Sequence, residues 1–451
     1  MITSLSKALR LGEIPRAALV GAGGKTTALF QLAHELEKPV LLSATTHLAL
    51  EQTLLADVHY VINCVDDIHK INFQDLTGII LLTGPDNGKG RTKGLDDACI
   101  EAVYRAAESH HLPLLIEADG ARCLPFKAPR DHEPPIPAFC DLVVVIAGLS
   151  AVGKPLDMEH VYNPDGVAEL SGLMPGGLVT AETIARVLSS QSGGLKNIPP
   201  QARRVALLNQ ADTAELQSTG HQIAGRLLKV YDTVVIASLS PDSGLLQGGK
   251  TNPLIYAVHE KTAGIILAAG KSSRAGTSKL NLIWKGEPLF RYAVNAAIDA
   301  GLDPVILVTG CYHDELAQAA EDLPVEIVFN PEWESGISTS IKTGLKALGS
   351  RSGGAIYLLA DQPQVSPALL MGLTEMHAST LSPIVLPVIN GERGNPVLFD
   401  RCTFLAAMAL EGDAGGRQLF SKFTSKQLVW HDASILFDVD TLDDYNRLIS
   451  H

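Results

Sequence analysis

The sequence predicts an α/β protein made of two domains. Short apolar runs rich in β-branched residues alternate with helix-like segments through most of the 451 residues. Gly or Asp bounds these runs, a pattern typical of parallel strands joined by helices. The series restarts after residues 238–262, a stretch rich in Gly, Pro and Ser with weak periodicity, where we expect the domain boundary. The predicted domains are residues 1–255 and 262–451.

Each predicted domain has its own series of strands, seen as short apolar runs between turn residues. The first series is AALVG, PVLLSA, GIILLTG, LPLLIEADG, DLVVVIAG, RRVALLNQAD and DTVVIAS. The second series is AGIILAAG, PVILVTG, VEIVFN, AIYLLADQP and SPIVLPVI. Helical patterns separate the strands in both series, so we expect a parallel α/β sheet in each domain.

Composition limits the ligands and the compartment. The formal net charge is −13 and Lys and Arg form no run, which argues against binding of nucleic acid or of an anionic membrane. The apolar runs are too short to span a bilayer, and the charged N-terminus is unlike a signal peptide. The six cysteines form no C-x-x-C pair, which predicts reduced thiols in the cytoplasm and no structural zinc site. A small phosphorylated ligand still fits, since backbone amides bind anions locally.

Two strings resemble the end of a phosphate-binding P-loop, G-x-x-x-x-G-K-[ST]. VGAGGKTTALF (residues 20–30) and LAAGKSSRAGTSKL (residues 267–280) have Leu19 and Ile265 in place of the first glycine. Only the first lies between a predicted strand and a predicted helix, which presents a helix N-terminus to a phosphate. It predicts a P-loop-like domain that binds ATP or GTP. The residues expected to act are Gly21, Gly23 and Gly24 for close backbone approach, Lys25 for charge, and Thr26 or Thr27 for Mg²⁺.

Polar residues after two other predicted strands extend this N-terminal site. Glu117 and Asp119 lie at the end of the predicted strand LLIEADG, where a carboxylate can hold a magnesium ion. Asn209 and Asp212 in LLNQAD resemble the base-reading N-K-x-D of GTPases, with Gln210 in place of the lysine. Plainer roles are also open to these residues, since glycine turns join many strands to helices and carboxylates after strands often cap helices.

The second Gly-Lys string predicts a loop. Glycines and a proline interrupt the segment after Lys271, and a helical pattern resumes only at PLFRYAVNAAIDAG. A loop that follows a strand and carries small residues and cations can wrap a triphosphate from outside. The residues expected to do so are Leu267, Ala268, Ala269 and Gly270 at the strand end and the cationic Arg274 and Lys279.

The C-terminal half carries several motifs in a recognisable order. They are LAAGKSSRAGTSKL, NPEWESGISTSIKTGL, LLADQPQV, RGNPVLF, GDAGGR and FDVDTLDDY. Together they resemble the molybdenum cofactor nucleotidyltransferases, and LAAG is similar to the cytidylyltransferase (MocA-like) branch, because the guanylyltransferases usually have LAGG. The resemblance implies a Rossmann-like nucleotidyltransferase domain with the MobA-like fold. Ala275 stands where this family usually has methionine in the triphosphate loop.

The resemblance also implies a reaction. A phosphate of molybdopterin would attack the α-phosphorus of CTP and release pyrophosphate, with Mg²⁺ sharing the negative charge. Arg274 and Lys279 would hold the triphosphate, and Asp361 and Asp440 would bind the Mg²⁺. The structural alternatives are a helix N-cap for Asp361 and an Asx turn for Asp440.

Other residues of these motifs are expected to contact the two substrates. Ser338 and Ser340 would contact the nucleotide, although either serine could instead cap the helix that follows. Arg393 and Asn395 would contact the molybdopterin substrate.

The N-terminal half contains GAGGKTT, ATTHL, EADGARCLPFKAP and LLNQAD in order. These strings resemble the YqeC-like accessory family of selenium-dependent molybdenum hydroxylases. The resemblance implies that both halves serve maturation of such hydroxylases, with the hydroxylase apoenzyme as a partner.

Two other functions stay open from the sequence. One is sugar-phosphate nucleotidyl transfer on the same fold, although the sequence lacks the G-x-G-T-R-x-x-P that usually follows the first strand of those enzymes. The other is a nucleotide-gated, metallochaperone-like switch whose C-terminal half binds the cofactor without turnover. Retention of Arg274, Lys279 and Asp361 argues against an inactive C-terminal half.

Overall fold

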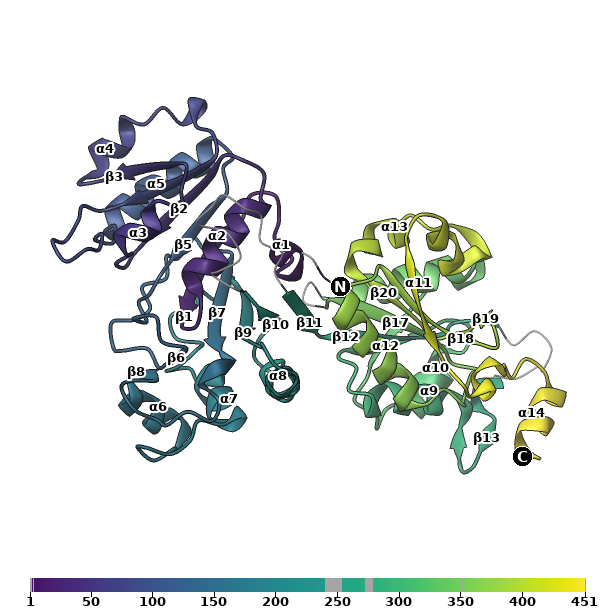
Figure 1. Cartoon of the computed structure of the whole chain (residues 1–451). Helices are drawn as coiled ribbons and strands as arrows, with labels where there is room; N and C mark the ends of the chain where they lie inside the picture. The colour runs from purple at the N-terminus through teal and green to yellow at the C-terminus, as the bar shows by residue number, and fades with distance from the viewer. Residues whose placement is uncertain (1, 3, 240–253, 272–278, 350–351, 451) are drawn as a thin grey trace. The chain divides into compact units, whose positions relative to one another are not determined.

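The computed structural model describes residues 2, 4–239, 254–271, 279–349 and 352–450. The chain forms two compact units, residues 1–259 and 260–451, each an α/β fold with its own large sheet (Figure 1). The stretch in which we expected the boundary contains strand β11 (Leu254–Glu260), which joins the first sheet. As an edge strand β11 is only partly buried, which explains its weak apolar periodicity.

The first unit is built on a nine-stranded sheet. In spatial order its strands are β11, β10 (Thr233–Ser238), β9 (Arg203–Asn209), β7 (Leu142–Gly148), β1 (Arg16–Gly21), β5 (Leu114–Glu117), β2 (Val40–Ala44), β4 (Ile79–Thr83) and β3 (Val58–Val61). Every pair from β10 to β3 is parallel, as the sequence predicts. A separate parallel pair is formed by β6 (Phe126–Lys127) and β8 (Val161–Tyr162).

Helices follow most strands of the first unit. They are α1 (Leu5–Ala8), α2 (Lys25–Glu35), α3 (Leu50–Thr53), α4 (Val65–His69), α5 (Asp97–Ser109), α6 (Pro164–Ser171), α7 (Ala181–Ser189) and α8 (Ala214–Leu227). The helix predicted after Lys25 is α2. Its apolar face, including Ala28, Leu29 and Leu32, is buried, so packing against the sheet holds the helix directly after β1.

The second unit has an eight-stranded sheet. Its strands are β16 (Glu326–Phe329), β15 (Val305–Thr309), β12 (Thr262–Ala268), β17 (Gly354–Leu359), β20 (Val397–Asp400), β18 (Ile384–Ile389) and β19 (Glu392–Arg393) in order, with β21 (Ser425–Val429) beside β18. The β16–β15–β12–β17 part is parallel. However, β20 runs antiparallel to β17 and β18, so the expectation of a wholly parallel sheet is wrong here.

A tight turn accounts for this reversal of direction. Asn390 and Gly391 both have positive φ, 52° and 88°, and join β18 to β19 as an antiparallel hairpin. Asn-Gly is the dipeptide that such two-residue hairpin turns favour. The chain therefore turns back along its own sheet at β19 and β20 instead of crossing over through a helix.

Alternating side chains on the second sheet bury two separate cores. On β12, Ile265 packs in one core and Ile266 in the other. The first core includes Ile341 of α11 (Ile337–Ala347), and the second includes Phe290 of α9 (Leu289–Asp299). Helices thus cover both faces of this sheet, because successive strand residues point to opposite sides.

The remaining helices of the second unit are α10 (His313–Ala319), α12 (Pro367–Thr380), α13 (Phe404–Met408) and α14 (Leu442–Ile449). The segment before α9 forms a 3₁₀ turn and the hairpin β13 (Ile283–Trp284)–β14 (Glu287–Pro288), so the predicted lack of a helix there is confirmed for residues 279–288. Within the described ranges, none of the helices combines the length and the apolar character needed to cross a membrane.

In each sheet, the chain adds strands first on one side of a central strand and then on the other side. In the first unit, the chain builds β2 to β5 on one side of β1 and then places β7 on the other side. In the second, it builds β15 and β16 on one side of β12 and then β17 on the other. Loops that leave neighbouring strand ends in opposite directions open a crevice, where ligands bind in folds of this kind.

Candidate active site and a second polar cavity

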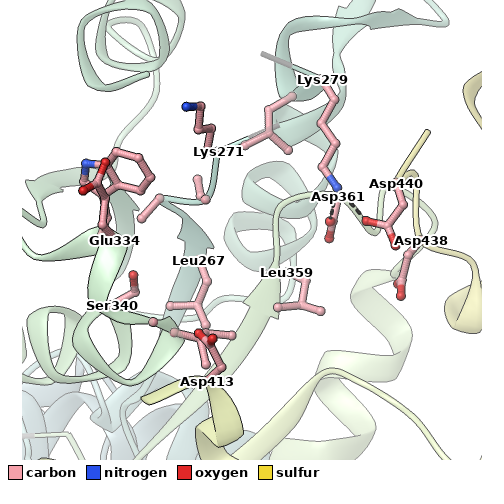
Figure 2. A pocket seen from close by; sticks show the side chains of 17 residues that line it. Leu267, Lys271, Lys279, Glu334, Ser340, Leu359, Asp361, Asp413, Asp438 and Asp440 are labelled. Atoms are coloured by element: carbon pink, nitrogen blue, oxygen red, sulfur yellow. Dashed lines mark hydrogen bonds and ion pairs between the residues drawn. The ribbon is translucent and has the colours of Figure 1, made fainter. Parts of the chain in front are cut away.

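A cavity of about 530 Å³ lies at the carboxyl ends of β12 and β17 (Figure 2). Residues 267–271 line it from the end of β12, and Leu359 and Asp361 line it from the end of β17. Lys279, Ser340 and Asp440 come from three further segments. The predicted strand-end loop and the predicted acids therefore meet at the switch point of the sheet.

The side chains of Lys279, Asp361 and Asp440 form one ion-paired group at this cavity (Figure 2). Lys279 Nζ donates to Asp361 Oδ2 at 2.7 Å and to Asp440 Oδ1 at 2.9 Å. Burial lowers the pKa of Lys279, but the two carboxylates outweigh it and raise that pKa above its usual value. The ammonium therefore stays charged at neutral pH.

A third carboxylate, Asp438, lies beside this group. Burial raises the pKa of Asp438; a hydrogen bond from Gln362 opposes the rise, and the nearby carboxylates of Asp361 and Asp440 add to it. Gln362 Nε2 donates to Asp438 Oδ1 at 2.5 Å, and the backbone N–H of Val439 donates to the carbonyl of Asp361 at 3.0 Å. These bonds fix residues 438–440 against the end of β17 and so bring Asp440 to the cavity.

The opposite wall of the cavity is the start of α11. Gly336 precedes this helix with φ 106°, and a Cβ there would lie 2.6 Å from Asp413 Oδ1. Ser340 lines the cavity and accepts a hydrogen bond from Asn330 Nδ2 at 3.0 Å. Ser338 is buried in the same helix and does not line the cavity.

The helix caps are supplied by other residues. Ser366 caps α12, Thr441 caps α14, and α11 begins at Gly336 without a side-chain cap. The capping alternatives for Asp361 and for the serines are therefore wrong. The Asp440 side chain instead reaches Lys279.

Some predicted residues lie elsewhere. Arg393 is exposed on β19, with its guanidinium 5.1 Å from the centre of the Phe420 ring, and neither it nor Asn395 lines the cavity. Arg274 and Ala275 fall outside the described residues. The cavity also has wall residues that the sequence reading did not select: Trp333, Glu334, Asp413 and Asp438. Asp413 and Asp438 belong to GDAGGR and FDVDTLDDY, so the motifs contained the signal.

The donor set suits a hard divalent cation. Asp361 and Asp440 offer carboxylate oxygens that already share one cation, the ammonium. Across the part of the chain that the structure describes, no cluster of three or more His, Cys, Asp and Glu side chains forms a ready-made metal site. Mg²⁺ is commonly held by one or two carboxylates plus substrate phosphates, and two acids beside a cavity fit that pattern.

A second cavity, of about 390 Å³, lies at the switch point of the first sheet. Residues 23–27 line it after β1, Glu117 lines it at the end of β5, and Asn209 lines it at the end of β9. Arg91 and Arg122 also belong to its wall. Two of the three predicted glycines, the lysine and the threonines are thus brought together with one predicted acid, whereas Gly21 does not line the cavity.

Glycine is required by the geometry of this turn. Gly23 and Gly24 have φ values of 87° and 120°. A Cβ on Gly23 would lie 2.4 Å from the backbone nitrogen of Gly148, and one on Gly24 would lie 2.5 Å from Asn209 Nδ2. The first residues of α2, Lys25 to Thr27, line the cavity, and the first amides of a helix have no partner within it, so an anion there could accept from them.

Buried charges hold the turn in place. Lys25 Nζ donates to the Gly21 carbonyl at 2.6 Å and lies 3.3 Å from Asp119 Oδ1. Asp119 also accepts from the Gly21 backbone N–H and from Lys127, and Lys127 in turn contacts Glu133 at 2.9 Å. Asp119 therefore lies behind the turn and supports it, outside the residues that line the cavity.

Glu117 and Asn209 make specific contacts at the cavity wall. Thr26 Oγ1 donates to Glu117 Oε2 at 2.8 Å; burial raises the pKa of Glu117, against the attraction of Lys25 and this hydrogen bond. Asn209 Nδ2 donates to the Gly23 carbonyl at 2.7 Å, so Asn209 ties the glycine turn to β9. The structure does not bring Asp212 to this cavity; its carboxylate accepts a hydrogen bond from Ser238.

Comparisons with known proteins separate the two halves in the same way. Residues 17–165 match the family described as YqeC protein, and residues 264–428 match the MobA-like NTP transferase domain. The chain is 30% identical over 203 residues to the uncharacterized protein YqeC of Escherichia coli, covering 44% of this chain and 77% of that protein. It is 30% identical over 197 residues to the purine catabolism protein PucB of Bacillus subtilis, covering 41% and 94%. It is 26% identical over 182 residues to the molybdenum cofactor cytidylyltransferase of Escherichia coli, covering 40% and 92%.

The buried ion pairs of Lys127 predict that replacing this lysine strongly destabilises the first unit. The Lys127 and Asp119 side chains are almost fully buried, and Lys127→Met would remove the lysine partner of Glu133 and leave Asp119 with Lys25 as its counter-charge. We expect a loss of about 3–5 kcal/mol in the unfolding free energy of the first unit. Urea unfolding followed by circular dichroism measures this loss.

Two comparisons make that result specific. Every tryptophan lies in the second unit, at positions 284, 333 and 430, so the tryptophan fluorescence transition should stay unchanged. Lys70→Met removes an exposed lysine that pairs with Asp67 and should leave both transitions unchanged. Equal stability of Lys127→Met and Lys70→Met would show that the buried network does not support the turn.

Proposed function

Because the chain belongs to the YqeC family in its N-terminal half and carries a MobA-like NTP transferase domain in its C-terminal half, we propose that it is a molybdenum cofactor cytidylyltransferase fused to a nucleotide-binding accessory domain. The C-terminal half is a nucleotidyltransferase of the MobA-like type. The observation that carries the proposal is the meeting of Lys279, Asp361 and Asp440 at the cavity beside β12. The LAAG sequence and the relative named molybdenum cofactor cytidylyltransferase support CTP and the molybdenum cofactor as substrates.

The proposed reaction is transfer of CMP. A phosphate oxygen of molybdopterin forms a bond to the α-phosphorus of CTP, while the bond from that phosphorus to the bridging oxygen of the β-phosphate breaks. Pyrophosphate leaves with the bonding electrons. Such a reaction needs alignment and charge neutralisation more than covalent help from the protein.

The residues of the cavity divide these tasks. The backbone of residues 267–270 positions the triphosphate at the strand end, and Lys279 supplies positive charge at one side of it. Asp361 and Asp440 would hold a Mg²⁺ ion, which when bound would neutralise charge that develops on the phosphate oxygens. Ser340 lies on the opposite wall as a polar contact for the nucleotide. A contact of Arg274 with the triphosphate stays a prediction.

For the N-terminal half we propose binding of the phosphates of ATP or GTP in the 390 Å³ cavity. The backbone of the turn and the Lys25 charge would contact the phosphates, and the hydroxyl of Thr26 or Thr27 would reach a Mg²⁺ ion. This domain would then assist the delivery of the finished cofactor to a selenium-dependent molybdenum hydroxylase.

The choice of nucleotide tests the proposed function directly. In a mixture of equal CTP and GTP with molybdenum-loaded molybdopterin, we expect cytidylated product to exceed guanylated product by about tenfold or more, a difference that one well-formed base contact can supply. Mass spectrometry of the products measures the ratio. A preference for GTP would overturn the assignment to the cytidylyltransferase branch.

The metal role of Asp361 predicts a large loss of turnover. Asp361→Asn removes one anionic metal ligand, and we expect pyrophosphate release from CTP to fall by about a hundredfold or more, as the loss of several kcal/mol of charge stabilisation implies. Asp314→Asn, at an exposed position of α10, is the matched control and should be unaffected. Near-normal turnover in Asp361→Asn would refute the metal role. Cofactor binding without turnover in the unmodified protein would favour the non-catalytic switch.

Lys25 predicts nucleotide binding in the N-terminal half. Calorimetry of the full chain with ATP and with GTP should show binding that Lys25→Ala weakens by about tenfold or more, because a charged hydrogen bond to phosphate is lost. Lys70→Ala does not change the cavity and should bind as the unmodified protein does. Unchanged binding in Lys25→Ala, or no binding of either nucleotide by the unmodified chain, would contradict the proposed site.

A further inference from the structure

The ammonium of Lys279 already occupies the place of a cation between two acids (Figure 2). It contacts one oxygen of Asp361 and one of Asp440, at 2.7 and 2.9 Å. The Lys279 side chain is 17% exposed and that of Asp361 23%, so solvent screens this pair only in part. Lys279 is therefore held by two acids of its own chain.

A divalent cation would compete with this ammonium. Mg²⁺ binds carboxylate oxygens at about 2.0–2.1 Å, so an ion held by both Asp361 and Asp440 would lie close to the ammonium, which is bonded to one oxygen of each carboxylate. The Mg²⁺ ion and the ammonium are both positive, and so close together they would repel each other strongly where water is partly excluded. Entry of the metal therefore requires the lysine side chain to leave the two acids.

A nucleoside triphosphate supplies the charge that resolves this competition. The cavity beside Lys279 also has Glu334, Asp413 and Asp438 in its wall, and the described part of the wall has only Lys271 as a second cation. A triphosphate that lies against residues 267–270 would bring anionic oxygens within reach of Lys279, which lines the same cavity. The lysine and the metal would then both have anionic partners.

We propose that Lys279 is an internal counter-ion that keeps divalent metal off the Asp361–Asp440 pair until a nucleoside triphosphate draws the ammonium away. This inference rests on the proposed function, because it takes these two acids as the metal ligands. It adds an order to binding: nucleotide, or nucleotide already carrying the metal, precedes stable occupation of the pair. By linkage, the metal strengthens nucleotide binding by the same factor that the nucleotide strengthens metal binding.

Direct measurement of Mn²⁺ binding tests this order without any turnover. Electron paramagnetic resonance of free Mn²⁺ gives the dissociation constant for the full-length protein in the absence of nucleotide. We expect Lys279→Gln to bind Mn²⁺ at least about tenfold more tightly than the unmodified protein, within the usual range of coupling between adjacent sites. With a non-hydrolysable CTP analogue present, the two proteins should differ much less.

Two control variants separate the counter-ion from a general charge effect. Lys279→Arg keeps a cation that can bridge two carboxylates, and should bind Mn²⁺ as weakly as the unmodified protein does. Lys271→Gln removes an exposed lysine of the same cavity, and should change the Mn²⁺ dissociation constant less than about twofold because the charge is screened by solvent.

The outcomes separate this inference from the proposed function. If Lys279→Gln binds Mn²⁺ no more tightly than the unmodified protein, while Asp361→Asn abolishes binding, the metal ligand stands and the counter-ion role is overturned. If Lys279→Gln with Asp361→Asn binds as tightly as Lys279→Gln alone, the metal is not on Asp361, and the proposed metal site fails. Circular dichroism of each variant shows that it is folded before Mn²⁺ is added.

Discussion

The carboxyl edge of each parallel strand set controls where chemistry can take place in this protein. Backbone pairing holds β12 between β15 and β17, and β1 between β5 and β7, so that several strand ends are presented together. The loops beyond a central strand and its neighbour then diverge, and a cavity results on each sheet. Polar groups at these ends are close to one another although they are distant in the sequence.

Both cavities also use lysine in a similar way. Lys25 lies against Asp119, and Lys279 lies against Asp361, so each cation has an acidic partner before any ligand arrives. In a chain of net charge −13, such pairs keep positive charge at the places where an anionic ligand would bind. The two pairs differ in burial: Lys25 is 5% exposed and is braced through Asp119 by Lys127, whereas Lys279 is bound by acids at a more open edge.

Local patterns were sufficient for most of the architecture. All strands of the two predicted series are present, and α2 and α9 begin where the helical patterns do. The edge strands β3 and β11 are only partly buried, so they carry little apolar periodicity and were not predicted. The second sheet was expected to be wholly parallel, but the turn at Asn390 and Gly391 makes β20 antiparallel to β17 and β18, and this dipeptide is typical of a hairpin.

Site residues were predictable where a motif ends a strand, as at Asp361 and residues 267–270. Cavity residues on a helix were harder to predict, because the rotation of the helix about its axis decides which side chains face the cavity. Ser338 and Ser340 lie in one motif, and only Ser340 lines the cavity. Which side chains face Asp413 and Trp333 depends on the packing of α11 against residues 412–421, a contact between segments distant in the sequence. The spacing of residues along the sequence does not show that these two segments are in contact.

The hydrogen bonds that hold residues 438–440 against the end of β17 affect where the C-terminal unit can be truncated. The match to the MobA-like domain stops at residue 428, whereas the second carboxylate contributed to Lys279 comes from residue 440. A fragment trimmed to the limits of that match, residues 264–428, would retain all eight strands except the first two residues of β12 and the last residue of β21. It would nevertheless lack Asp440, so an apparently intact domain would keep only Asp361 of the two acids that bond Lys279.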